Sequence, residues 1–264
     1  MKSLKARCKK IFTRRNWDII LELTRVNFKV IDSNSMLGIA WSIVVPLSLF
    51  LVMYFAFRSR FGQDMYAYPV FLLIGISCVN FFITSSTYTI EVFHVYSGMV
   101  SNTTVPREDM IIADAFITMY KFLIELFLCY LLALFYGLFN WASLLFLIPL
   151  VVAYLAFTLG VGLILSTMRC FSRDISHVWT IMSRFLLFAT PIFYPLNSLS
   201  PGLGNIIYWL NPLTPFLISF RDITMNTHGM SIINYFYSLF LGVLFFIFGY
   251  YVFITNESVA MERA

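Results

Sequence analysis

Three ionisable side chains interrupt long apolar stretches of this sequence, and each invites a chemical interpretation. Lys121 and Glu125 are one helical turn apart, so a helix places them on one face as an internal ion pair. Arg184 lies at a similar depth in a later apolar stretch, and we expect it to face Glu125 across two helices. Such an intramembrane charge cluster predicts either a structural contact between helices or a relay for protons or ions.

Few other residues indicate catalysis or metal binding. The chain has no GxxxxGK[ST] phosphate loop, no HExxH and no GxSxG motif, so we expect neither an enzyme nor a bound cofactor. Its three histidines are far apart and its four cysteines form no CxxC pair, which predicts no metal site. Glu91 and His94 keep open the alternative of a membrane enzyme with a polyprenyl substrate.

Aromatic residues make up 19% of the chain. Many are expected to face lipid or to lie at the membrane interface. Aromatic faces inside a channel would let sugar rings slide past without tight bonds, whereas packing within the protein is the alternative for each residue. The candidates for channel lining are Tyr54, Phe81, Phe82, Tyr88, Phe193 and Tyr194.

The elements that position these residues are predicted to be membrane helices. The chain of 264 residues is 60% hydrophobic and only 12% charged, whereas a soluble domain carries about 25% charged residues. Charge-free runs long enough to cross a bilayer recur along the sequence, and they lack the period-two alternation of a β-barrel. Because backbone groups in lipid must bond within a helix, we predict one all-α transmembrane domain over residues 1–264.

The charge-free runs predict six transmembrane helices. An even number of crossings puts both termini on one side, and the basic N-terminal tail places that side in the cytoplasm. This tail accounts for the net charge of +5 better than a nucleic-acid surface does. The predicted spans are residues 36–57, 69–90, 111–136, 144–168, 175–194 and 232–254.

Two apolar segments are not expected to span the membrane. Within the cytoplasmic region 1–33, the charges Asp18, Glu22 and Arg25 recur at helical spacing, which predicts an amphipathic helix at the membrane interface. A soluble helix packed on another domain is the alternative. Residues 195–220 contain many prolines and glycines, so short re-entrant or interfacial helices are expected there.

Several short motifs occur in a fixed order on this six-span frame. They are Ser35-Met-Leu-Gly-Ile-Ala-Trp41, Pro46-Leu47, Phe71-Leu-Leu-Ile-Gly75, Val105-Pro-Arg107, Phe171-Ser-Arg-Asp-Ile175, Thr190-Pro-Ile-Phe-Tyr194 and Leu210-Asn-Pro-Leu-Thr-Pro215, with Arg221 downstream. In this order the chain resembles the membrane subunit of ABC transporters that export bacterial surface polysaccharides. It departs from that family before Leu37, where a basic Arg-Tyr-Arg-like run is replaced by Phe28 to Asn34.

The resemblance implies a homodimeric permease in the bacterial inner membrane, with two copies of a separate P-loop ATPase that binds ATP and magnesium. The cargo would be a polysaccharide on an undecaprenyl pyrophosphate-type lipid, with O-antigen as the first choice. The first and fifth spans would line the pore, and residues 195–220 would form an outer gate. Arg25 and Lys29 would meet the pyrophosphate. The residues expected to couple the chain to the ATPase are Ser97, Asn102, Pro106, Arg107, Glu108, Asp109, Arg173 and Asp174.

Other functions remain compatible with the same architecture. Teichoic acid, capsule, a drug or a small lipid are alternative cargoes, because the sequence predicts no long periplasmic domain that would separate them. A non-catalytic assembly subunit is a further alternative. Loss of surface polysaccharide in a deletion strain would separate an exporter from these possibilities.

Overall fold

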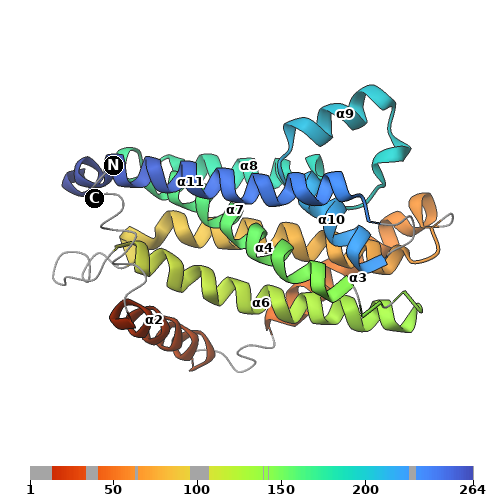
Figure 1. The fold of residues 1–264 in the computed structure, drawn as a ribbon, viewed down its shortest axis with the longest axis horizontal. Helices are drawn as coiled ribbons and strands as arrows, with labels where there is room; N and C mark the ends of the chain where they lie inside the picture. Colours follow the sequence, from red (N-terminus) through yellow and green to blue (C-terminus); the bar gives the residue numbers. More distant parts are fainter. Residues whose placement is uncertain are drawn as a thin grey trace.

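The chain forms an elongated bundle of helices (Figure 1). The computed structural model describes residues 14–33, 41–62, 65–95, 107–138, 140–141, 143–225 and 230–263, and within them all regular structure is helical. The predicted all-α class is therefore confirmed.

Within the described ranges, five helices are long and apolar enough to cross a membrane. They are α3 (Trp41–Phe61), α4 (Tyr68–Val95), α6 (Arg107–Phe135), α7 (Ser143–Phe171) and α11 (Ile232–Arg263), and they correspond to five of the six predicted spans. The shorter helices are α2 (Arg14–Ser33), α8 (Ile175–Ala189), the 3-10 turn η2 (Leu196–Ser198), α9 (Pro201–Leu210) and α10 (Leu213–Met225).

The predicted span 175–194 is shorter than expected. Helix α8 ends at Ala189, because a residue before proline disfavours helical backbone, and Thr190 accordingly takes an extended conformation before Pro191. Its 15 residues give a rise of about 22 Å, less than the roughly 30 Å of a bilayer core. Residues beyond Ala189 are extended or in short turns, so this stretch is not one continuous spanning helix.

Helix α4 lies at the centre of the bundle. Most of its length is buried inside the chain, and it packs against α3, α6, α7, α8 and α10. Hydroxyl side chains on α4 bond back to its own carbonyls, as in Ser86 Oγ to Phe82 O at 2.6 Å, so they cost little in a dry interior. The surrounding helices therefore pack on a central helix with few unsatisfied polar groups.

Helices α7 and α11 run parallel with their backbones in close approach. Tyr235 on α11 donates to the carbonyl of Phe146 on α7, 89 positions earlier. The same offset recurs one and two heptads further on, where Gly242 meets Ala153 and Gly249 meets Gly160. A Cβ added to Gly249 would lie 2.1 Å from the Gly160 carbonyl oxygen, so only glycine permits this approach.

The parallel direction constrains the intervening chain. Because α7 and α11 begin at the same end of the bundle, residues 172–231 must carry the chain back from the end of α7 to that starting end. Helix α8 begins this return beside α4, and α10 then packs between α4, α7 and α11. Helix α9 has no buried residue and stands away from the bundle in Figure 1.

Helix α2 packs on the first turns of α6. The rings of Trp17 and Phe116 are 6.1 Å apart, and the hydroxyl of Thr24 contacts the carbonyl of Ala113 at 3.5 Å. In Figure 1, α2 lies at the end of the bundle opposite α9, the end where α11 also terminates. The predicted helix is confirmed, and its position at a membrane interface stays a prediction.

Candidate functional site

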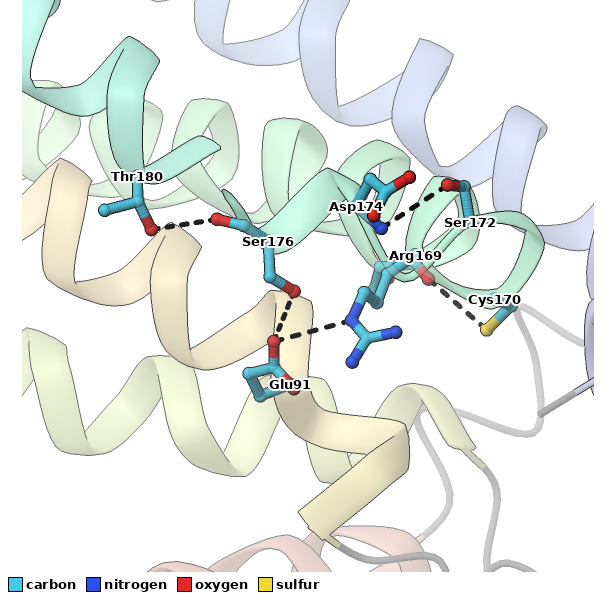
Figure 2. Close-up of polar contacts among 8 residues, drawn as sticks. Glu91, Arg169, Cys170, Ser172, Asp174, Ser176 and Thr180 are labelled. Carbon is cyan, nitrogen blue, oxygen red and sulfur yellow. Dashed lines mark hydrogen bonds and ion pairs between the residues drawn. The ribbon is translucent and has the colours of Figure 1, made fainter. Parts of the chain in front are cut away.

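Among the described residues, a polar site lies at each end of the pairing between α4 and α8. At the first, which we call the junction, one carboxylate oxygen of Glu91 on α4 contacts two other segments. It accepts a hydrogen bond from the hydroxyl of Ser176 on α8 and lies 3.5 Å from Nε of Arg169 on α7 (Figure 2). The junction residues Glu91, Arg169 and Ser176 therefore hold the end of α4 to the turn between α7 and α8.

Contacts continue from the junction along α8. The indole of Trp179 donates to Ser86 Oγ on α4 at 3.1 Å, and its ring lies 6.0 Å from that of Phe82. Arg173 and Asp174 are exposed in the adjoining turn, where the amide of Asp174 contacts Ser172 Oγ (Figure 2). The two predicted coupling residues thus lie on an accessible surface beside the junction.

The remaining predicted coupling residues lie between Ser97 and Asp109 in the sequence, and the last three are in the first turn of α6. Ser97, Asn102 and Pro106 lie outside the described residues, as do the side chains of Arg107 and Glu108. Asp109 is fully buried in the first turn of α6, where the helix dipole favours a carboxylate. The side chain of Asp109 is therefore enclosed by this chain rather than exposed, and its role in coupling stays a prediction.

At the opposite end, Arg221 of α10 binds three backbone carbonyls. Its Nε and Nη2 donate to Phe71 O at 3.2 and 3.1 Å, its Nη2 also donates to Ile192 O at 2.8 Å, and its Nη1 donates to Pro191 O at 2.7 Å. The guanidinium also lies over the ring of Phe71. Since Pro191 and Ile192 follow the end of α8, the positive charge meets the negative end of that helix.

Further hydrogen bonds hold the segment Thr190–Met225, which we call the outer segment. Asn211 Nδ2 donates to Thr190 Oγ1 at 2.8 Å, and Tyr68 on α4 donates to Phe193 O at 3.0 Å. Tyr208 on α9 donates to Asn234 Oδ1 at 2.5 Å, and burial raises the pKa of its phenol. A cavity of about 560 Å³ opens beside Arg221, lined also by Asp222, Asn234 and Met65 among others.

The structure corrects part of the predicted channel lining. Phe81 stacks on Phe122 at 4.7 Å, Phe82 stacks on Phe157 at 5.4 Å, and both are about 3% exposed, so they belong to the core. Phe193 is equally buried. Tyr54 and Tyr194 are half-buried and Tyr88 is exposed, so only these three remain candidates.

The predicted charge cluster does not form within the chain. Glu125 is buried, with Oε1 accepting from Asn80 Nδ2 at 3.2 Å, whereas Arg184 is exposed on α8. No ion pair joins Glu125 to Arg184 or Lys121 in the described part of the chain. Lys121 instead lies over the ring of Tyr88 at 5.9 Å, and α8 packs mainly on α4 and α7 rather than on α6.

The pyrophosphate candidates on α2 are untested. Arg25 is exposed and pairs with Glu22 at 3.0 Å, while the side chain of Lys29 lies outside the described residues.

The importance of Glu91 and of the carbonyl contacts of Arg221 was not predicted. A charged residue at the end of a charge-free run was the available signal for Glu91, and Arg221 stood out only as the last of the ordered motifs.

Comparison with known proteins gives a consistent assignment. The family model described as ABC-2 type transporter matches residues 20–225. An O-antigen export system permease protein RfbA of Klebsiella pneumoniae is 28% identical over 90% of this chain and 91% of its own length. A second from the same organism is 26% identical over 88% of both chains, and one from Myxococcus xanthus is 24% identical over 78% and 79%.

Proposed function

Because the chain belongs to the ABC-2 type transporter family of multi-pass membrane proteins, we propose that it is the permease subunit of an ATP-driven exporter of a lipid-linked bacterial surface polysaccharide. O-antigen is the proposed cargo. The observation that carries this proposal is that relatives matched over nearly their full length are O-antigen export permeases. The ATPase, with its ATP and magnesium, would be a separate partner chain.

The direction of the helices supports the proposal of six membrane crossings. Helices α7 and α11 are parallel, so the chain between them must cross back. The first contact between α8 and α4 joins Ser176 to Glu91, and beyond the end of α8 the carbonyl of Phe193 accepts from Tyr68 at the start of α4. Glu91 and Tyr68 are about 35 Å apart along α4 at the rise of an α-helix. Helix α8 and residues 190–193 would together cover a bilayer core, and the rest of the outer segment, with α9 and α10, would not span the membrane.

With six crossings, both termini lie on the same side, and the basic N-terminus assigns that side to the cytoplasm of the inner membrane. The junction of Glu91, Arg169 and Ser176 is then cytoplasmic, and Arg221 with the outer segment is periplasmic. Helix α2 lies on the cytoplasmic end, where it would contact the membrane interface.

A homodimer accounts for the exposed apolar faces of α3 and α8. Only 6% of the apolar, membrane-crossing stretch of α3 is buried inside the chain, the smallest share among the five long helices. Large apolar side chains on α8, including Phe185 and Phe188, are more than 60% exposed. Two copies that meet along these helices would enclose a pore, with the partially exposed Tyr54, Tyr88 and Tyr194 as aromatic lining.

The two polar sites suggest how ATP hydrolysis is transmitted. A partner ATPase in contact with Arg173, Asp174 and residues 97–108 would displace the turn between α7 and α8. Since Glu91 ties that turn to α4, and Arg221 ties α4 to the outer segment, the displacement would reach the periplasmic end.

Deletion of the chain in its source cell tests the proposal. The expected result is loss of surface polysaccharide with accumulation of lipid-linked polymer inside the cell, and reintroduction of the gene restores export. Purification should yield the chain with a bound ATPase. Normal surface polymer in the deletion strain would overturn the cargo, and absence of any co-purified ATPase would overturn the transporter mechanism.

A further inference from the structure

Helix α8 has three distinct sides. Ser176, Trp179 and Ser183 face the chain itself, where Ser183 is buried and the first two bond to α4. The exposed surface then divides into an apolar side and a polar side. The apolar side consists of Val178, Ile181, Met182 and Phe185, each about half exposed or more.

The polar side is a stripe of four exposed residues: Arg173, His177, Thr180 and Arg184. Their spacing of four, three and four positions keeps them on one face of a helix. Arg173 precedes α8 in the turn beside the junction, and Arg184 lies eight residues beyond Ser176, about 12 Å further along the axis. The stripe therefore leads from the cytoplasmic end toward the middle of the membrane.

Arg184 differs from the other described cations of the membrane region. Arg221 is satisfied by three carbonyls, and Lys121 lies over an aromatic ring. The described part of this chain offers Arg184 no hydrogen bond or ion pair, and its side chain is exposed. A guanidinium facing hydrocarbon at this depth is costly, so this side of α8 must face water or a charged ligand.

We propose that the polar stripe of α8 lines the transport pathway and binds the diphosphate headgroup of the cargo's polyprenyl lipid. Guanidinium groups bind phosphate oxygens through paired, charge-assisted hydrogen bonds, and the imidazole of His177 adds a donor between them. The hydroxyl of Thr180 donates to the carbonyl of Ser176 at 2.8 Å, so Thr180 adds polarity to the stripe rather than a free donor. Arg173 and Arg184 are eleven residues apart, about 16 Å, so they form two successive sites rather than one tight site. The carboxylate of Asp174, which is next to Arg173 in the sequence, lies off the stripe.

This inference rests on the proposed function and adds the residues that meet the lipid. The two successive cations, Arg173 and Arg184, suit a diphosphate headgroup that must enter and leave the pathway. Each arginine alone compensates part of the negative charge of the headgroup and so binds it weakly enough to release it. The apolar side of α8 is left to the contact between copies in the proposed homodimer. The two sides of one helix thus separate the charged pathway from the dimer contact.

The test uses the purified permease–ATPase complex in nanodiscs, titrated with undecaprenyl diphosphate while ATP hydrolysis is measured. We expect R184Q to raise the half-activating lipid concentration about tenfold, the size of one charged hydrogen bond. R184K should keep most of the response. R60Q, which changes an exposed arginine in the last turn of α3 and away from the stripe, serves as the matched control. Undecaprenol, which lacks the phosphates, should not distinguish R184Q from the unaltered complex.

An unchanged half-activating concentration in R184Q overturns the proposal, as does an equal shift with undecaprenol. Dissociation of the dimer in R184Q, with an unaltered lipid response per dimer, would instead assign Arg184 to contact between copies and also overturn it. The unaltered complex is also titrated with lipid-linked polysaccharide; if its ATP hydrolysis responds neither to that nor to undecaprenyl diphosphate, the proposed function fails, and the lipid site fails with it. A normal response in both the unaltered complex and R184Q removes only the lipid site.

Discussion

Arg221 binds the carbonyl oxygen of Phe71, which lies 150 positions earlier in the chain, through both Nε and Nη2. The same side chain also donates to the carbonyls of Pro191 and Ile192, which follow the end of α8. One guanidinium thus joins α10, α4 and the start of the outer segment. This contact gives the sharpest tests of the fold at this end of the bundle.

Replacement of Arg221 by Met should destabilise the protein by about 3 kcal/mol, because three buried carbonyls lose a charged donor. The expected measurement is a lower unfolding midpoint in detergent. Arg60→Met removes an exposed arginine and serves as the control with little change. An Arg221→Met protein as stable as the control would mean that water or a neighbouring group replaces these bonds.

Replacement of Gly75 by Ala should lower stability by about 2 kcal/mol. The added Cβ would lie 2.8 Å from Nη2 of Arg221 and 3.0 Å from Cγ2 of Ile192, and the guanidinium cannot move without loss of its carbonyl bonds. The cost should shrink when Arg221→Met is already present, which a double-mutant cycle measures. Additive effects of the two changes would contradict the proposed contact.

Replacement of Gly249 by Ala should separate α7 from α11 and cost about 3 kcal/mol, at the upper end for overpacking, because the obstruction is a backbone carbonyl rather than a side chain. Gly202→Ala is the matched control, since a Cβ there meets nothing within 4 Å. Thermal unfolding of both variants gives the comparison. Equal midpoints would show that the two helices can move apart freely.

The junction should affect export more than stability. Glu91→Gln weakens the contact with Arg169 while it keeps the shape of the side chain, and this partly exposed pair contributes less than about 1 kcal/mol. We expect export per ATP hydrolysed to fall about fivefold, the effect of a weakly coupled contact. The control is Glu22→Gln, which breaks the exposed pair with Arg25.

Ser176→Ala tests the same contact from α8. Because Ser176 and Arg169 bond to the same oxygen of Glu91, Ser176→Ala and Glu91→Gln should not be additive. Export and ATP hydrolysis are measured in proteoliposomes for each single variant and for the double variant. Proportional loss of both activities would indicate a folding defect instead of lost coupling.

The long helices were predictable because hydropathy depends on composition over a whole segment. The charge-free run from Asp64 to Glu91, for example, predicted α4 with its approximate ends. The short length of α8 was harder to predict. Although Pro191 could have indicated the end of the helix, the predicted span continued to residue 194. Local backbone preference ended the helix where hydropathy alone would have extended it.

The site was harder to predict because it depends on which side of a helix faces the protein. Phe81 and Tyr88 lie on the same helix and look alike in sequence, but the first is in the core and the second is exposed. The pairing of Arg184 with Glu125 failed for the same reason, since equal depth does not make two helices neighbours. Arg221 recognises backbone carbonyls, which carry no signal in the sequence of the accepting residues.

The close approach of α7 to α11 also defines a fixed frame of reference within the protomer. Backbones that touch at Gly160 and Gly249 cannot slide past each other without collision, so the two helices must travel together during transport. Spin labels near their starting ends, at Leu145 and Ile233, are both exposed and should keep a constant separation through the ATP cycle. Displacements of α3 and α8 can then be measured against this pair.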